Sequence, residues 1–251
     1  MGRRTGVRAV AVAAVLLLGA GGCGGPKGAG DGKTPGKPAA SASPPASAPA
    51  PSPSAPPAGD AKPAPGDVLP GMVGAAVARA QLAALTTGKP GTMAGYSRDK
   101  FTHWAEQGDK CDTREVVLQR DGKDVTRDAE CRAVSGTWKS LYDGVTVNEA
   151  SKLDIDHMVP LAEAWRSGAA AWDAAKRKAF ANDLTRPQLL AVSAASNRSK
   201  GDQSPDLWQP SDKSSWCQYG RAWTTVKSHY GLTVTDAERA MLTTMIDTCA
   251  A

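Results

Sequence analysis

The sequence predicts an α+β domain in the C-terminal part of the chain. Fourteen of the 18 Pro residues lie before residue 91, so the folded part is expected to follow them. Beyond that point two short segments typical of strands, residues 153–159 and 189–192, stand among longer segments with helical spacing of apolar residues. Few short strands among many helices, without a regular alternation, indicate the α+β class.

Residues 1–25 are typical of an export signal. Arg3, Arg4 and Arg8 precede an apolar stretch over residues 10–20. That stretch is too short to cross a bilayer, which takes about 20 apolar residues. Residues 20–23, Ala-Gly-Gly-Cys, resemble the lipobox of bacterial lipoproteins, which implies lipidation of Cys23 and a membrane anchor. Ordinary release by a signal peptidase is the alternative.

Residues 26–66 consist mainly of Pro, Ala, Ser and Gly and contain no large apolar side chain, so we predict a disordered tether. Residues 67–95 are predicted to hold one short helix, over residues 73–85, followed by a linker. This helix either packs on the domain or ends the tether. The domain itself is predicted over residues 96–251.

The formal net charge of +5 gives no support for a nucleic-acid partner. Residues 1–95 hold nine Lys and Arg against three Asp and Glu, whereas residues 96–251 hold 21 against 22. The basic charge therefore belongs to the leader and the tether, and any case for nucleic acid must rest on local chemistry.

Four cysteines remain after Cys23, and an even number in an exported chain indicates two disulfides. We expect the two local pairs, which flank the central segment: Cys111 with Cys131, and Cys217 with Cys249. A structural zinc site is the alternative, although no pair has the Cys-x2-Cys spacing that zinc sites favour.

The first elements of the domain are predicted from short patterns. Aromatic residues at helical spacing predict a helix over residues 96–107. Residues 114–120 and 133–141 are rich enough in β-branched or aromatic residues for short strands, and Asp143 with Gly144 forms a turn.

The remaining elements surround two polar segments. We predict strands over residues 153–159 and 189–192, helices over 161–166 and 172–180, and a short helix that ends at Gly201. Two helices, over residues 216–230 and 235–249, close the domain, and Asp236 and Glu238 complement the dipole of the second.

The polar segments are Asp154-Ile-Asp156-His157, at the end of a strand, and Asn197-Arg-Ser-Lys-Gly-Asp, in a loop that opens a short helix. Together with the strand between them, the stretches DIDHMVPLAEAW and LLAVSAASNRSKGD resemble the ββα-metal core of HNH endonucleases. They are similar to the HNH-type C-terminal domain of GmrSD-type restriction enzymes. The resemblance covers residues 96–251 and implies a ββα-metal core embedded in a mostly helical, disulfide-bonded domain.

The resemblance implies a role for each polar residue. His157 would be the general base that activates a water, and Asp156 and Asn197 would be ligands of one divalent metal ion. Hydrolysis of a phosphodiester needs a base that titrates near neutrality and a cation that neutralises developing charge. Oxygen ligands suit Mg²⁺ first and Mn²⁺ second, whereas Zn²⁺ fits them less well.

Further residues are assigned to the same site. Arg198 and Lys200 are expected to meet phosphates, while Asp154 and Glu163 either support the site or face solvent. The family has an Asn before the second strand that holds the base-bearing loop, and this chain has Gln188 there. The side-chain amide of Gln is one methylene further from the backbone than that of Asn. Either Gln188 holds the loop in spite of this difference, or Asn182 holds it instead.

The other candidates have structural interpretations. Residues 176–178, Lys-Arg-Lys, form either a solvated helix face or a second phosphate contact. His103 and His229 are read as packing or surface residues, and most Trp residues as core.

The leading hypothesis is an exported, membrane-tethered, metal-dependent endonuclease that cuts DNA, and RNA as a second substrate, without strong sequence preference. No base-reading module is recognisable in the sequence, and no protein partner is implied. Two alternatives stay open. One is a non-catalytic binding lipoprotein, and the other is a zinc hydrolase of cell-wall material that uses Asp156, His157 and another His.

Overall fold

The computed structural model describes residues 69–250. The export signal, Cys23 and the predicted tether over residues 26–66 lie outside this range. The helices of the described part are α1 Ala75–Ala84, α2 Thr113–Asp121, α3 Leu161–Arg166, α4 Ala174–Ala181, α5 Ala194–Lys200, α6 Trp216–Tyr230 and α7 Asp236–Asp247. Its strands are β1 Glu106–Gly108, β2 Cys111–Asp112, β3 Lys123–Arg127, β4 Ala133–Lys139, β5 Thr146–Val147, β6 Leu153–His157 and β7 Leu189–Ser193.

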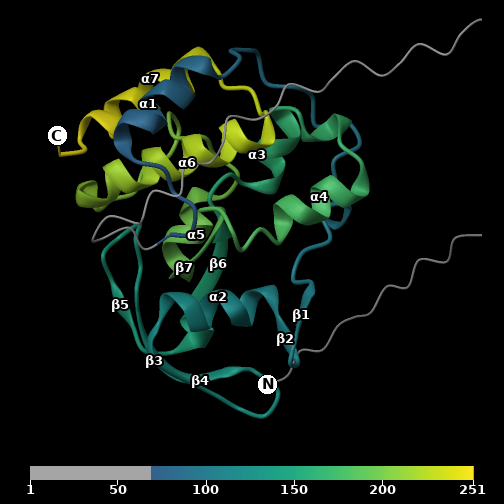
Figure 1. The fold of residues 1–251 in the computed structure, drawn as a ribbon, viewed down its shortest axis with the longest axis vertical. Coiled ribbons are helices and arrows are strands. Elements are labelled where there is room, and N and C mark those ends of the chain that lie inside the picture. The colour runs from purple at the N-terminus through teal and green to yellow at the C-terminus, as the bar shows by residue number, and fades with distance from the viewer. Residues whose placement is uncertain (1–68, 251) are drawn as a thin grey trace, which may run out of the picture. The chain divides into compact units, whose positions relative to one another are not determined.

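The described part is an α+β fold, as the sequence predicts, built around the antiparallel pair β6 and β7 (Figure 1). Their register runs from Leu153 opposite Ser193 to His157 opposite Leu189. Helix α2 packs on one face of this pair and α5 on the other, while β1–β2 and β3–β4–β5 form two further small sheets. Helices α3 and α4 lie between β6 and β7 in the chain, where the sequence predicts helices over residues 161–166 and 172–180.

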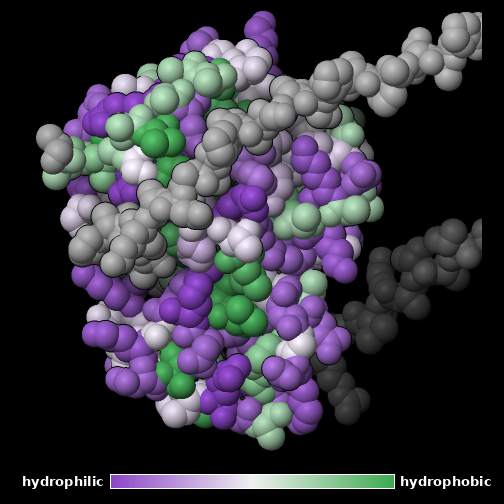
Figure 2. Space-filling view, viewed as in Figure 1, coloured by the Kyte–Doolittle hydropathy of each residue, from purple (hydrophilic) through white to green (hydrophobic). Residues whose placement is uncertain are grey.

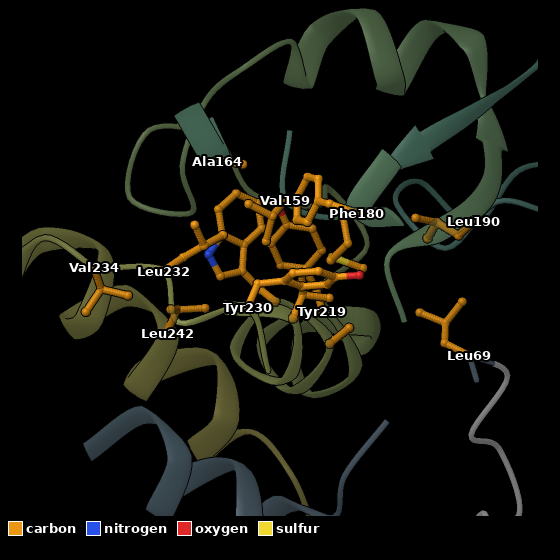
Figure 3. Close-up of a cluster of buried hydrophobic side chains, with 14 of the residues drawn as sticks. Leu69, Val159, Ala164, Phe180, Leu190, Tyr219, Tyr230, Leu232, Val234 and Leu242 are labelled. Atoms are coloured by element: carbon orange, nitrogen blue, oxygen red, sulfur yellow. The ribbon is translucent and has the colours of Figure 1, made fainter. Parts of the chain in front are cut away.

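The main hydrophobic core lies between the helices (Figure 3). Helix α1 packs against α6 and α7 and buries Ala78 and Leu82, so it is part of the domain core. Helix α7 begins with a capping box between Thr235 and Glu238. Gly220 of α6 allows α7 to come close, because a Cβ there would lie 2.9 Å from the Cβ of Met245.

A second core lies beneath the β6–β7 pair. Val117 and Leu118 of α2 are buried against Leu153 and Ile155 of β6 and against Leu189 of β7. Because side chains alternate along a strand, the residues between them on β6 face α5 instead. This alternation decides where the polar residues of β6 point.

Both expected disulfides are present. Cys111 is bonded to Cys131, and Cys217 to Cys249, so the local pairing is confirmed and no cysteine of the described part is left for a zinc site. The first disulfide ties the start of α2 to the hairpin of β3 and β4, and the second ties the start of α6 to the residues after α7.

Two expected elements are wrong. The helix predicted over residues 96–107 is reduced to one 3-10 turn, Arg98–Lys100, because Trp104 has a φ of 57° and the chain then enters β1. The strand predicted over residues 114–120 is helix α2. Its N-cap Asp112 accepts from the backbone N–H of Glu115, and burial of its apolar face outweighs the β-propensity of its Val residues.

The surface shown in Figure 2 is mainly hydrophilic, with separate hydrophobic areas between the polar side chains. The exposed large hydrophobic residues of the described part come from different elements and loops: Val77, Met93, Val134, Val145 and Leu207. Among residues 69–250, no helix has the length and apolar character needed to cross a membrane.

Candidate active site

The candidate site is built on strands β6 and β7 and the helix that follows them directly. Ser193, the last residue of β7, is the N-cap of α5 and accepts from the backbone N–H of Ser196. Gly201 ends the helix with a φ of 55°. The strand–strand–helix order therefore places Asp154, Asp156 and His157 of β6 close to a helix that carries Asn197 and Lys200.

His157 is held by the backbone of the inserted helices. Its Nε2 lies 3.0 Å from the carbonyl oxygen of Ala181, at the end of α4. A carbonyl oxygen can only accept, so Nε2 carries the proton and Nδ1 keeps its lone pair. The imidazole is therefore held in the tautomer whose Nδ1 can take a proton from a water.

The surroundings of His157 keep it neutral. Burial lowers its pKa from 6.5 to about 3, and the positive charge of Arg98 adds to this, although the hydrogen bond to Ala181 opposes it. The ring is only 4% exposed, and the indole of Trp104 lies beside it with 5.8 Å between the ring centroids. A neutral imidazole at physiological pH is the form that accepts a proton.

Gln188 holds the loop that follows His157. The backbone N–H of Met158 donates to its carbonyl oxygen at 2.7 Å. Its side-chain amide binds Val159 twice, because Oε1 accepts from the backbone N–H at 3.1 Å and Nε2 donates to the carbonyl oxygen at 3.0 Å. Gln188 thus makes the kind of contact expected of the family's Asn, whereas Asn182 binds another segment, Thr102 to Ala105.

Asp156 lies inside the protein with a buried cation. The ammonium of Lys200 is 2.8 Å from Asp156 Oδ2 and donates to the carbonyl oxygen of His157 at 2.9 Å. The hydroxyl of Tyr142 donates to the same Oδ2 at 2.5 Å, and burial with the nearby Asp156 charge raises the pKa of Tyr142 well above its usual value. Lys200 is completely buried, so the expectation that it meets phosphate is wrong.

Asp154 and Asn197 meet at the edge of the site. Asn197 Nδ2 donates to Asp154 Oδ2 at 3.1 Å, and the guanidinium of Arg198 lies 4.0 Å from the same oxygen. The Asp154 side chain is 32% exposed and that of Arg198 is 78% exposed. Of Arg198 and Lys200, the two cations expected to meet phosphate at this site, Arg198 is therefore the one whose charge reaches solvent.

Asp154 and Asp156 differ in how well they could hold a metal ion together with Asn197. Asp154 and Asn197 touch, and both side chains carry the oxygen donors that Mg²⁺ prefers. Asp156 already pairs with the Lys200 ammonium, so it does not share an open position with Asn197. In the described part of the chain, no group of three or more His, Cys, Asp or Glu residues is placed to hold a metal ion.

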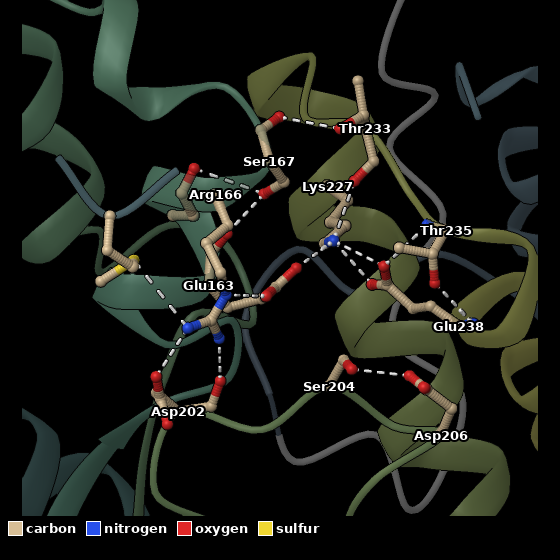
Figure 4. Close-up of polar contacts among 12 residues, drawn as sticks. Glu163, Arg166, Ser167, Asp202, Ser204, Asp206, Lys227, Thr233, Thr235 and Glu238 are labelled. Atoms are coloured by element: carbon tan, nitrogen blue, oxygen red, sulfur yellow. Dashed lines mark hydrogen bonds and ion pairs between the residues drawn. The ribbon is translucent and has the colours of Figure 1, made fainter. Parts of the chain in front are cut away.

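Glu163 does not support His157. It is buried in a separate polar cluster, where Lys227 lies 3.0 Å from one carboxylate oxygen and Arg166 lies 3.0 Å from the other (Figure 4). Lys227 is completely buried and also pairs with Glu238, while Arg166 pairs with Asp202. Both expectations for Glu163, support of the base or exposure to solvent, are therefore wrong, because α3 turns this residue toward α6 and α7.

The remaining candidates divide by their contacts. Lys176 lies 4.5 Å from the ring centroid of Trp172, and Arg177 donates to the carbonyl oxygen of Lys100, so two of the three cations at residues 176–178 take part in packing. His229 lies against Tyr230. His103, in contrast, lies beside Trp104 and acts electrostatically on His157, which the sequence did not indicate.

Sequence reasoning missed three participants. Ala181 contributes only its carbonyl oxygen, which leaves no signal in the side-chain pattern. Trp104 lies far from the polar motifs in the chain and is covered by the prediction that most Trp residues are core, whereas no pattern in the sequence singles out Tyr142. An aromatic residue with an unusual backbone conformation is visible only once the fold is known.

The chain is similar to one protein family and to one fungal protein. Residues 112–245 match the model of a family described as GmrSD restriction endonucleases, C-terminal domain. A protein of the fungus Arthroderma benhamiae, described as an uncharacterized secreted protein, is 51% identical over 186 residues, which are 74% of this chain and 91% of the fungal protein. No solved structure matches the chain.

Proposed function

Because the chain belongs to the family of the C-terminal domain of GmrSD restriction endonucleases, we propose that it is an exported endonuclease that hydrolyses phosphodiester bonds of DNA, with RNA as a second substrate. The observation that supports this best is the hydrogen bond from His157 Nε2 to Ala181, which leaves Nδ1 free to accept a proton. The bond fixes a general base at the end of a strand–strand–helix unit.

In the proposed reaction, His157 Nδ1 takes the proton of the attacking water. The carbonyl oxygen of Ala181 keeps the ring in place and stabilises the imidazolium that forms. The low pKa of His157 belongs to the free protein. A bound phosphodiester brings negative charge close to the ring and raises that pKa, so the base becomes stronger when substrate is present.

Asp154 and Asn197 would hold one Mg²⁺ ion, with water in its other positions. When bound, the ion neutralises charge on the phosphoryl and leaving oxygens. Arg198 is exposed next to this pair and would contact the phosphate backbone. Lys200 and Tyr142 keep Asp156 and the His157 carbonyl in fixed positions, so they act on the site from inside.

Indiscriminate cutting is the simpler expectation, because phosphate contacts carry no sequence information. Arg198, which is exposed, and the general base His157 would contact only the sugar-phosphate backbone of the nucleic acid. We therefore propose weak sequence preference.

Export is proposed from the leader and from the relative described as secreted. A lipid anchor at Cys23 is the finer proposal, and it rests on the Ala-Gly-Gly-Cys sequence alone. Wild-type protein expressed in a bacterium should partition into the detergent phase, and Cys23→Ser protein should not. Wild-type protein in the aqueous phase would contradict the anchor without affecting the nuclease proposal.

A non-catalytic binding protein is the second candidate, because Asp156 is neutralised by Lys200 and His157 is nearly inaccessible. Incubation of the purified mature protein with supercoiled plasmid separates the two candidates. The nuclease proposal predicts nicked and linear products with Mg²⁺ and none with EDTA. Plasmid that is bound but never cut, with Mg²⁺ or Mn²⁺, would favour the binding protein.

A further inference from the structure

Trp104 lies next to His157 without belonging to any polar motif. Its ring is tilted by 33° against the imidazole of His157, and the ring of His103 packs edge-on against it with 5.3 Å between the centroids. The side chain is half-buried, and it also packs on the core beneath β6 and β7. Part of an aromatic ring therefore remains accessible beside the general base.

The backbone holds Trp104 in an unfavourable conformation. Its φ of 57° lies in the left-handed region, which is unfavourable for a bulky side chain. The side chain of Asn182 holds the backbone on both sides of Trp104. Its Oδ1 accepts from the backbone N–H of Ala105 at 2.8 Å, and its Nδ2 donates to the carbonyl oxygen of Thr102 at 2.7 Å. Such outliers persist where the surroundings fix them, and they gather at functional sites.

One short segment positions both the base and this aromatic residue. Ala181 binds the imidazole of His157, and Asn182, the next residue, binds the two ends of the Thr102–Ala105 segment. The position of the indole relative to His157 is thus set by two consecutive residues at the end of α4. A rigid relationship of this kind suits a residue that orients substrate.

An exposed cation acts on the same imidazole. The positive charge of Arg98 helps to lower the pKa of His157, so it also acts on a phosphate that approaches this imidazole. Proteins that bind unpaired nucleotides use an accessible aromatic ring that stacks on the nucleobase, together with cations that meet the phosphates.

We propose that Trp104 stacks on an unpaired nucleobase next to the scissile phosphate. This inference rests on the proposed nuclease function and names its substrate class, which is single-stranded or locally unpaired nucleic acid. A paired base inside a duplex has both faces covered by its neighbours and cannot stack on a side chain without being extruded.

The test measures binding separately from cleavage. Labelled single-stranded and duplex oligonucleotides of the same sequence are titrated with mature protein in EDTA, and the fluorescence anisotropy is recorded. Trp104→Ala should weaken binding of the single strand by about 5-fold to 150-fold, which is a stacking energy of about 1–3 kcal/mol expressed as affinity. Trp104→Phe keeps a ring and should retain most of the affinity. Trp172→Ala, another half-buried Trp, is the matched control and should bind like the wild type.

An abasic site moved along the oligonucleotide identifies the stacked base. With the abasic site at one position, the oligonucleotide should bind the wild type as weakly as the intact oligonucleotide binds Trp104→Ala. The same abasic oligonucleotide should bind Trp104→Ala no more weakly than the intact one does. If the wild type binds and cuts but Trp104→Ala binds equally well, or if duplex is preferred, the inference is wrong and the nuclease proposal stands. If the wild type neither binds nor cuts nucleic acid, the proposed function fails and the inference with it.

Discussion

The imidazole of His157 donates a hydrogen bond to the carbonyl oxygen of Ala181, a residue 24 positions further along the chain. The contact exists because α3 and α4 are inserted between the two strands that carry the rest of the site. It selects one tautomer of the ring and leaves Nδ1 as the proton acceptor. The inserted helices therefore contribute directly to the proposed chemistry.

Gln188 should matter for stability as well as for activity. Gln188→Ala leaves the backbone N–H and carbonyl of Val159 buried without partners, which should cost about 1–3 kcal/mol of unfolding free energy. Urea denaturation measures this loss. Gln119→Ala, at an exposed position of α2, is the control and should stay within about 0.5 kcal/mol of the wild type. Equal stability of both variants would show that Gln188 does not hold the loop.

Lys200 should stabilise the protein through Asp156. Lys200→Met leaves a buried carboxylate without its cation, so we expect a loss of about 3–5 kcal/mol. Adding Asp156→Asn should recover part of that loss, and the double-mutant cycle gives the coupling energy. Lys178→Met, on the exposed side of α4, is the control. Additive effects of the two substitutions would contradict the pairing.

Asp154 and Asp156 should differ in metal binding. Calorimetric titration with Mg²⁺ should show affinity lowered about tenfold or more by Asp154→Asn, because Asp154 is the carboxylate in contact with Asn197. Asp156→Asn should change it little, since Lys200 occupies that carboxylate. The reverse result would return the ligand role to Asp156, as the family resemblance implies. Melting temperatures of both variants check that each is folded.

Acid should destabilise the protein through Asp183. Burial opposes its ionisation, but hydrogen bonds from Tyr230 and Thr185 outweigh burial, so the pKa of Asp183 is lowered below its ordinary 3.8. The folded state therefore binds a proton at Asp183 less readily than the unfolded state does. Ionised Asp183 stabilises the fold at pH values above its ordinary pKa of 3.8, and this stabilisation is lost as the pH falls through the lower pKa of the folded state. Asp183→Asn should be less stable than the wild type at pH 6, and the difference should shrink at lower pH. A difference independent of pH would contradict this role.

The sequence predicted the elements that local pattern determines. Helices α3 and α6 and the start of β6 lie where apolar spacing and Pro160 place them. It failed for residues 96–107, because Asn182, 77 positions beyond Ala105, fixes that segment in a non-helical form. The α2 segment failed for a related reason, since packing against β6 and β7 overrides its β-propensity.

The polar residues of the site were predictable, but their partners were not. Asp154, Asp156, His157 and Asn197 stand out because strand and helix patterns frame them. Which carboxylate pairs with Lys200 and which touches Asn197 depends on the side-chain alternation in β6 and on the placement of α5. Those contacts are tertiary, and no spacing in the sequence encodes them.

A plasmid-nicking assay of His157→Ala and Asn197→Ala across a Mg²⁺ titration tests the central claim most directly. His157→Ala removes the proton acceptor, so its cleavage rate should fall by about 100-fold or more at every Mg²⁺ concentration. Asn197→Ala should recover part of its rate at high Mg²⁺, because extra cation offsets a lost neutral ligand. If His157→Ala cuts at nearly the wild-type rate, or if Mg²⁺ restores it as fully as Asn197→Ala, His157 is not the general base.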